Sequence, residues 1–454
     1  MQLFLFVVLL SSVLPRIFGQ VPAIHPMAPQ PDDRFKADIL VVVAHPDDEG
    51  MAIGYLAKAV LDQHKRVAVV YGTRGDGGGN AIGLEQAAAL GAEREMEARR
   101  AIAVVGITNA WFIGAPDTPS QDVLRSLEIW NHGSALWQVV RLVRLTRPQV
   151  IMTWLPAYSA GENHGDHQAS GVLATEAFDM AADPTVFTEQ ITPPRDHTSP
   201  GNLTEGLQPW QAQKLYFFSD TANQAALDGK GPQYPWDEIS PSRNVSYGRI
   251  ALESIANHRT QDYPGLMAAE ALKKRDLGVL KQMRTRLVLG KSLVPGSVTG
   301  DVFEGVVSAP IPFRRARGYE AEGRNGFSAE LGGPWVFYQQ FWKAHDLPRL
   351  HELFKPEVRV GLSSEVSIPV LLHNDTGGNV KFEVTAAAPA GWSAPKGTGS
   401  YPLGPHQSRS IEISIPTPPK EEAAHRVQVR VNGPAGKIAD VSLDVSVAKG
   451  ALPQ

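Results

Sequence analysis

Two short segments of the sequence hold side chains that could bind a metal ion and move a proton. The first is VAHPDDEG at residues 43–50, and the second is ENHGDH at residues 162–167. Together they offer imidazoles and carboxylates in a chain without cysteine, which is the ligand set of a catalytic rather than a structural zinc site. Such a site leaves one position for water, whose pKa zinc brings close to 7. The adjacent Asp47 and Asp48 therefore provide for one ligand and one base.

Each segment also has a purely structural interpretation. A histidine that follows a strand often only forms hydrogen bonds, and an aspartate pair before a helix commonly caps the helix and faces its dipole. In the same way, His164 and His167 could lie on the surface at the start of a helix that Asp166 caps. The functional interpretation is favoured if both segments meet at one place in the fold.

The elements around the two segments predict how they meet. Short apolar strands alternate with helical patterns in the first third of the chain. The strands are expected at 37–45, 66–72, 110–114 and 150–156, and the helices at 54–63, 86–106 and 134–147. This alternation favours an α/β domain with a Rossmann-like, mostly parallel sheet that is covered by helices on both faces. Because ligands bind beyond the carboxyl ends of such strands, both segments are expected at one edge of the sheet.

The rest of the chain has two different patterns. Residues 185–350 are less regular and include one expected helix around Leu266–Leu289. After Phe354, apolar and polar residues alternate between Gly, Pro and Asn turns, which predicts an all-β sandwich of immunoglobulin-like type at 355–448. The expected organisation is therefore an α/β domain at 37–350 followed by this sandwich.

The start of the chain has the pattern of a secretory signal peptide. The apolar run Leu3–Leu14 and the small residue Gly19 predict a signal at 1–20, followed by a Pro-rich linker at 21–36. A secreted or periplasmic protein is thus expected. Neither residue before the run is Lys or Arg, so an uncleaved N-terminal membrane anchor is the alternative. The formal net charge of −4 and the lack of a basic block argue against a nucleic-acid partner.

Several motifs, in this order, resemble the PIG-L/LmbE family of zinc-dependent N-deacetylases. They are VVAHPDDEG, TRGDGGGN, AEREMEARRAIAVVGI, FIGAPDT and HGDH, and the resemblance extends over about residues 37–175. It continues more weakly in QKLYFFS at 213–219 and SYGRIALESIANHRTQ at 246–261. The C-terminal part resembles the NEW3-type modules of exported carbohydrate-active enzymes. In this chain, two roles for the module stay open: it could act as a spacer, or it could contact glycans or the cell surface.

The resemblance implies a role for each matching residue of the two segments. It implies one zinc ion per chain, bound by His45, Asp48 and His167. Asp47 matches the general base that activates water. His164 matches the histidine that stabilises the oxyanion and can protonate the leaving amine.

Arg94 and Asp117 match positions that contact the sugar substrate in relatives. The alternatives are a surface pair of Arg94 with Glu97 and a turn role for Asp117. Glu162 stands where many sugar-specific members have Tyr, which leaves open how the oxyanion is held. Three residues near the motifs have no single assigned role: Glu49, Asp166 (a helix cap or a partner that orients a histidine) and His258.

The resulting expectation is an exported zinc-dependent N-deacetylase that acts on an N-acetylglucosamine-type amino sugar or glycoconjugate by hydrolysing a linear amide C–N bond. Two alternatives stay open. The same zinc chemistry could act on another acylated amide, or the protein could bind carbohydrate without catalysis. The presence of all three expected ligands and the base favours an enzyme. No membrane span is expected in the mature chain.

Overall fold

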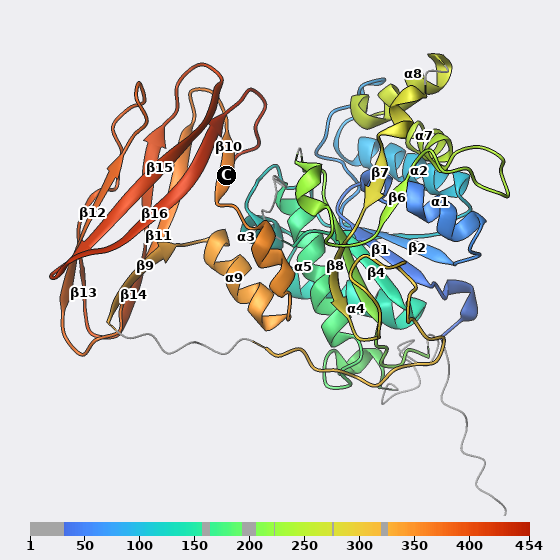
Figure 1. The fold of residues 1–454 in the computed structure, drawn as a ribbon, viewed down its shortest axis with the longest axis horizontal. Coiled ribbons are helices and arrows are strands. Elements are labelled where there is room, and N and C mark those ends of the chain that lie inside the picture. The colour runs from blue at the N-terminus through green and yellow to red at the C-terminus, as the bar shows by residue number, and fades with distance from the viewer. Residues whose placement is uncertain (1–30, 157–163, 193–205, 222, 275–276, 319–325) are drawn as a thin grey trace, which may run out of the picture.

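The chain forms a six-stranded sheet flanked by helices and, after it, a two-layered β-sandwich (Figure 1). The computed structural model describes residues 31–156, 164–192, 206–221, 223–274, 277–318 and 326–454. The predicted signal peptide at 1–20 and the first ten residues of the predicted linker at 21–36 lie outside the described residues. None of the described helices is long and apolar enough to cross a membrane.

The six-stranded sheet has the strand order β3-β2-β1-β4-β5-β8. Its strands are β1 (Ile39–Val43), β2 (Val67–Tyr71), β3 (Asn109–Phe112), β4 (Val150–Trp154), β5 (Lys214–Phe218) and β8 (Val288–Ser292). The first five in this order are parallel to their neighbours, and β8 runs antiparallel to β5. The predicted mostly parallel sheet is therefore confirmed.

Helices cover both faces of this sheet. They are α1 (Ile53–Leu61), α2 (Ala87–Val104), α3 (Val123–Ile129), α4 (His132–Thr146), α5 (Gly165–Met180), α7 (Tyr247–Ile255) and α8 (Met267–Lys274). Successive side chains of a strand point to opposite faces. Leu40 and Val42 of β1 accordingly share a core with α3, α4 and α5, whereas Ile39 and Val41 share one with α1, α2 and α7. Burial on both faces explains the nearly continuous apolar strands in the sequence.

The helix predicted around Leu266–Leu289 is wrong beyond α8. Within the described residues α8 runs to Lys274, and only a short 3-10 helix (Gly278–Lys281) follows. The chain then forms β7 (Arg284–Arg286), which pairs with β6 (Gln233–Pro235), and β8. The pairing of β8 with β5 buries Val288, and a side chain at Gly290 would collide with the Phe217 ring. A short apolar run fits a helix or a strand equally well, and pairing with β5 selects the strand.

The C-terminal part has two antiparallel-rich sheets, as the predicted all-β sandwich requires (Figure 1). One has the order β10-β16-β15-β12-β13 and the other β14-β11-β9. The strands are β9 (Phe327–Leu331), β10 (Glu357–Val360), β11 (Glu365–Asn374), β12 (Val380–Ala387), β13 (Gly399–Leu403), β14 (Gln407–Pro416), β15 (Glu422–Gly433) and β16 (Gly436–Val447). β9 pairs with β11, although it precedes the predicted start at 355. The predicted boundary therefore separates β9 from its own sheet.

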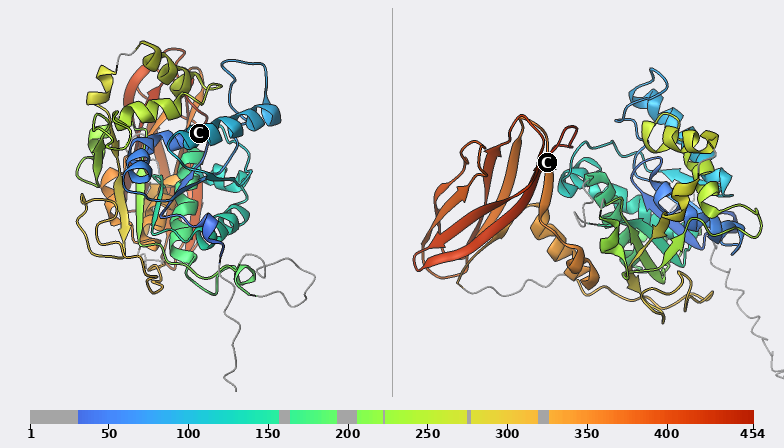
Figure 2. Two further views of the ribbon diagram at one scale, coloured as in Figure 1. Left: turned by 90° about the vertical axis from the view of Figure 1, so that its right-hand side faces the viewer. Right: turned by 45° about the horizontal axis from the view of Figure 1, so that its top comes forward.

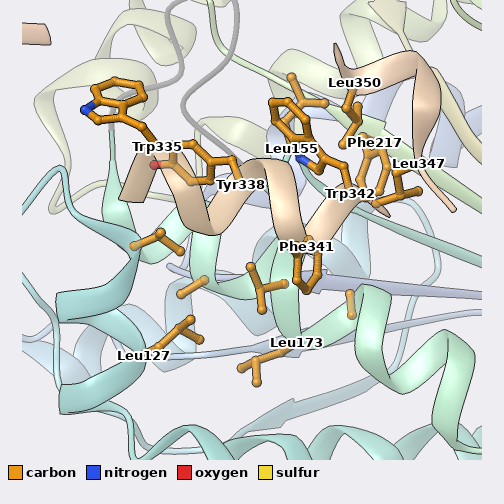
Figure 3. Packing of buried hydrophobic residues seen from close by; sticks show 14 of the residues in the cluster. Leu127, Leu155, Leu173, Phe217, Trp335, Tyr338, Phe341, Trp342, Leu347 and Leu350 are labelled. Atoms are coloured by element: carbon orange, nitrogen blue, oxygen red, sulfur yellow. The ribbon is translucent and has the colours of Figure 1, made fainter. Parts of the chain in front are cut away.

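Helix α9 (Pro334–Ala344) lies between the six-stranded sheet and the sandwich (Figures 1 and 2). Its buried aromatic residues belong to the same apolar core as α3 and α5, and Figure 3 shows Phe341 pointing toward Leu173 of α5. At its C-terminal end, His345 Nδ1 lies 2.7 Å from Asp179 of α5, and Lys291 of β8 donates to the same carboxylate at 2.6 Å. One continuous apolar core and this buried charge cluster thus join the two parts of the chain.

Candidate metal centre and active site

The two segments singled out in the sequence meet at the carboxyl ends of β1 and β4. These strands are neighbours in the sheet, and the chain leaves β1 through α1 on one face but enters β4 through α4 on the other. Such a change of direction opens a crevice in which α/β folds bind ligands. Ligand atoms of His45, Asp48 and His167 lie there within 4.8 Å of one another. The sequence-based expectation of a shared edge is confirmed.

Asp48 is held by three N–H groups that fix one of its oxygens. Its Oδ2 accepts hydrogen bonds from the backbone of Ala44 and His45, both at 2.9 Å, and from the Trp154 indole at 2.8 Å. The other oxygen, Oδ1, lies 3.2 Å from His167 Nε2. Burial alone raises the pKa of Asp48, but His167 and His45 hold that pKa well below its usual range. The carboxylate is thus ionised and presents Oδ1 to a metal position.

His45 has a carboxylate on each side of its ring. Nδ1 lies 3.8 Å from Asp48 Oδ2 and Nε2 lies 3.4 Å from Asp166 Oδ2. Burial lowers the pKa of His45, but its interactions with Asp166 and Asp48 outweigh this effect and raise the pKa to about 10. A histidine that donates one N–H to a carboxylate has its other nitrogen directed at the metal. With Nε2 facing Asp166, Nδ1 is the atom that would face a metal ion.

Asp166 is not the helix cap that one interpretation of the sequence suggested. The N-cap of α5 is His164, and Asp166 lies in the first turn with a side chain that is fully buried. Its Oδ2 accepts from Thr118 N at 2.8 Å in addition to facing His45. His45, His164 and Asp166 also bring ligand atoms together. Oδ2 of Asp166 is engaged by Thr118 N, whereas its Oδ1 is buried without a hydrogen-bond partner among the described residues. Asp166 is thus placed to orient His45.

His164 caps α5 through its ring. Its Nδ1 accepts from Asp166 N at 3.2 Å, so a neutral ring carries its proton on Nε2. Burial, followed by the charges of His45 and His167, lowers the pKa of His164 well below its usual value. The ring is therefore a neutral N–H donor beside the metal position. Glu162, whose effect the sequence left open, lies outside the described residues.

Asp47 has a backbone conformation that is uncommon for a residue with a side chain, with a φ of 123°. Its N–H donates to Glu49 Oε2 at 3.1 Å, and Glu49 Oε1 lies 2.7 Å from His258 Nε2. The side chains of Glu49 and His258 are each 1% exposed. Burial and the negative charge of Asp48 raise the pKa of Asp47 to about 7. Two residues without an assigned role, Glu49 and His258, thus support the turn that carries Asp47.

Arg94 supports the glycine-rich segment after β2. The guanidinium donates to the carbonyls of Gly75 at 2.6 Å and Gly79 at 2.7 Å, and its Nε donates to Thr260 at 3.3 Å. Glu97 accepts instead from the N–H and hydroxyl of Thr260. Both Arg94 and Glu97 are buried, so the alternative of a surface pair is wrong.

Asp117 joins the same segment to the metal position. Its Oδ2 accepts from Gly77 N at 2.7 Å, and its Oδ1 lies 3.9 Å from His45 Nε2. Within the described part of the chain, Asp117 Oδ1 is buried without a hydrogen-bond partner. The Asp117 carboxylate therefore fixes the turn at Gly77 with one oxygen and directs its other oxygen toward the site.

Trp154 is the main residue of the site that the sequence did not single out. Its indole stacks on the His167 ring with centroids 3.9 Å apart and an angle of 5° between the planes. The same indole donates to Asp48. The only signal in the sequence was its position near the end of the expected strand at 150–156.

Comparison with known families agrees with this geometry. Residues 40–178 match the family described as PIG-L: GlcNAc-PI de-N-acetylase. These residues form a PIG-L domain. All seven residues predicted for the site lie within the matched range, whereas His258 and Thr260 of the surrounding structure lie outside it.

Curated relatives of the PIG-L domain include enzymes named 1D-myo-inositol 2-acetamido-2-deoxy-alpha-D-glucopyranoside deacetylase. The one from Thermobifida fusca is 27% identical over 193 residues, which are 39% of this chain and 60% of that protein. One from Frankia casuarinae is 31% identical over 208 residues, 42% of this chain and 62% of that protein. The chain thus spans about 60% of the length of these relatives.

A solved structure similar to this chain is the N,N'-diacetylchitobiose deacetylase from Pyrococcus horikoshii. It is 17% identical, with a TM-score of 0.39, and the match covers 56% of this chain and 84% of that one.

Proposed function

We propose that the protein is a zinc-dependent N-deacetylase that hydrolyses the acetamide of an N-acetylglucosamine-type sugar or glycoconjugate. The observation that carries this proposal is the trio of His45, Asp48 and His167 with Asp47 directly beside it. The PIG-L domain and the names of its curated relatives support the same reaction class.

The donor set fits zinc. Two imidazoles and one carboxylate without a thiolate are the ligands of catalytic zinc sites, which keep a position open for water. The ionised Asp48 and the orientation of His45 by Asp166 suit such a site. When bound, zinc supplies a Lewis acid that polarises the amide carbonyl and makes water nucleophilic at neutral pH.

The chain's own residues then move the protons and hold the developing charge. Asp47, whose pKa of about 7 suits a general base at neutral pH, takes a proton from the attacking water. His164 donates its Nε2 proton as a hydrogen bond to the amide oxygen as negative charge builds there. Asp47 returns its proton to the nitrogen as the C–N bond breaks. One amide and one water thus yield acetate and a free amine.

The substrate side of the site is assigned to Asp117 and Arg94. Asp117 Oδ1, buried without a partner among the described residues, is placed to accept from a sugar hydroxyl. Arg94 is kept as a proposed substrate contact because it matches a substrate-contacting position in relatives, and the charges of Asp47 and Asp117 stabilise its positive charge. Its hydrogen bonds to Gly75 and Gly79 also shape the wall of the site.

The test is metal analysis coupled to acetate release from N-acetylglucosamine, its oligomers and acylated conjugates. We expect about one zinc per chain and acetate release that Asp47→Asn lowers by at least about a hundredfold, as is typical when general base catalysis is lost. Asp33→Asn, at a side chain that is 82% exposed, is the matched control and keeps the full rate. Zinc and sugar binding without acetate release would instead favour a binding protein. Full activity of Asp47→Asn would rule out the proposed base.

We also propose that the protein is exported by a signal peptide at residues 1–20. The apolar run Leu3–Leu14 followed by Gly19 supports this proposal. N-terminal sequencing of the protein recovered outside the cytoplasm should begin near Gln20 or Val21. An intact Met1 in a membrane fraction would favour the anchor.

A further inference from the structure

Gln121 connects the active-site side of the molecule to the β-sandwich. It is 4% exposed and follows the FIGAPDT motif. Its side-chain amide pairs in both directions with Arg359 of β10, since Nε2 donates to the Arg359 carbonyl at 2.5 Å and Oε1 accepts from Arg359 N at 3.4 Å. Nε2 also donates to Leu452 O at 2.7 Å, and Gln121 N donates to Pro453 O at 2.8 Å. Two of these four hydrogen bonds reach β10 of the sandwich, and the other two reach the tail that follows β16.

The identity of this side chain matters because β10 is an edge strand of its sheet. Edge strands leave backbone N–H and C=O groups without a partner strand. The Gln121 amide takes the place of a neighbouring strand residue at Arg359, because glutamine has both a donor and an acceptor. A carboxylate at this position could not donate to the two carbonyls, and an apolar side chain would leave them unpaired.

On its other side, the loop 117–122 is bound to the active site. Ser120 O accepts from Gly165 N at 2.8 Å, at the start of α5 and next to His164. Thr118 N donates to Asp166, the residue that faces His45. The approach is close, because a Cβ on Gly165 would lie 2.9 Å from Ser120 O. A displacement of the loop would therefore move Asp166 or α5 with it.

We propose that the sandwich braces the active site through Gln121, which acts as a positioning residue. By fixing the loop 117–122, the sandwich holds Asp117 at the substrate side and Asp166 behind His45. This assigns the C-terminal part a role in the hydrolase itself, beyond that of a spacer. The expected effect on kcat/KM rests on the proposed deacetylase function. The expected restraint of the loop 117–122 by the sandwich does not.

The brace is tested with Gln121→Met and Gln121→Glu in the full chain. Gln407→Met is the control, because the Gln407 side chain accepts from Gly404 N within the sandwich and does not contact Gln121 or its partners. Amide hydrogen exchange of residues 117–122 and 165–168, zinc content, kcat and KM are measured well below the melting temperature. We expect faster exchange in both Gln121 variants and a fall in kcat/KM of about tenfold or more, through KM first, with zinc content unchanged.

The outcomes separate the brace from the enzyme function. Unchanged exchange at 117–122 in both Gln121 variants overturns the brace, even if no acetate is released by the wild type. Faster exchange with an unchanged kcat/KM overturns the functional part, while the deacetylase proposal stands. A change in Gln407→Met equal to that in Gln121→Met shows general loosening of the sandwich and also overturns the brace. If Gln121→Glu does not fold, Gln121→Met alone decides.

Discussion

The Trp154 indole stacks face to face on the His167 ring, with centroids 3.9 Å apart, and donates its N–H to Asp48. One rigid side chain at the end of β4 therefore holds two of the three proposed metal ligands. The stacking and the hydrogen bond together fix the orientation of His167 and Asp48. Substitution of groups that orient metal ligands in this way typically lowers metal affinity or activity by about 10- to 100-fold.

Substitution of Trp154 should weaken zinc binding. Trp154→Phe keeps a ring for stacking but loses the N–H, so we expect zinc affinity to fall about ten- to a hundredfold. Zinc affinity should fall further in Trp154→Ala, which also loses the stacking on His167. Competition with a chromophoric chelator measures both. Trp210→Phe, which loses an indole bond to Pro148 O, is the control, and equal affinity of Trp154→Phe and this control would contradict the assignment.

His258 should affect turnover more than metal binding. His258→Ala leaves the buried Glu49 without its imidazole partner and loosens the turn that carries Asp47. We expect kcat to fall about tenfold or more with zinc content retained, since a small misplacement of a catalytic group is costly. His258→Gln, which can still donate to Glu49, should recover part of kcat. His64→Gln at the surface is the control, and loss of zinc in parallel with kcat would argue against this role.

His164 is expected to act as a neutral donor throughout the neutral pH range. Its pKa lies well below the usual value because of burial and the neighbouring histidines. His164→Ala should lower kcat by roughly 10²–10³, the effect of removing one donor to a developing oxyanion. Because the wild-type ring is already neutral, kcat should not decline between pH 6.5 and 8 through loss of a His164 proton. Such a decline in the wild type that His164→Gln abolishes would contradict the neutral donor.

His132 and Glu176 predict a pH dependence of stability away from the site. The His132 ring at the start of α4 lies 2.6 Å from Glu176 of α5, and this hydrogen bond raises the pKa of His132. Because the folded pKa is above the unfolded value of 6.5, the stabilisation is fully present below pH 6.5 and is lost as pH rises through the folded pKa.

We therefore expect His132→Gln to lower the melting temperature more at pH 5.5 than at pH 9. The exposed fraction of the His132 side chain is 40%, so the effect should be modest and should shrink with added salt. Thermal unfolding followed by circular dichroism at both pH values measures it. A difference that is the same at both pH values would show that the pair does not titrate in this way.

The sequence pattern predicted correctly those elements whose local pattern fits only one type of secondary structure. The apolar runs of β1, β2 and β4 and the helical periods of α1, α2 and α4 are properties of short segments, and these elements formed close to their expected bounds. The strands within residues 284–292 and strand β9 were not predicted. The secondary structure of such short apolar stretches depends on the strand with which they pair. Val288 is a strand residue because β5 lies beside it, and Phe327 belongs to the sandwich because β11 does.

The sequence by itself determined the chemistry that is available: His45, Asp47 and Asp48 after one strand, and His164 and His167 after another. Only the tertiary structure decided how these groups are supported. Trp154, Glu49 with His258, and Gln121 act through contacts between segments that are distant in the sequence, and no local period marks such contacts. A pattern records which side chains a segment carries, whereas their orientation depends on which elements pack against it.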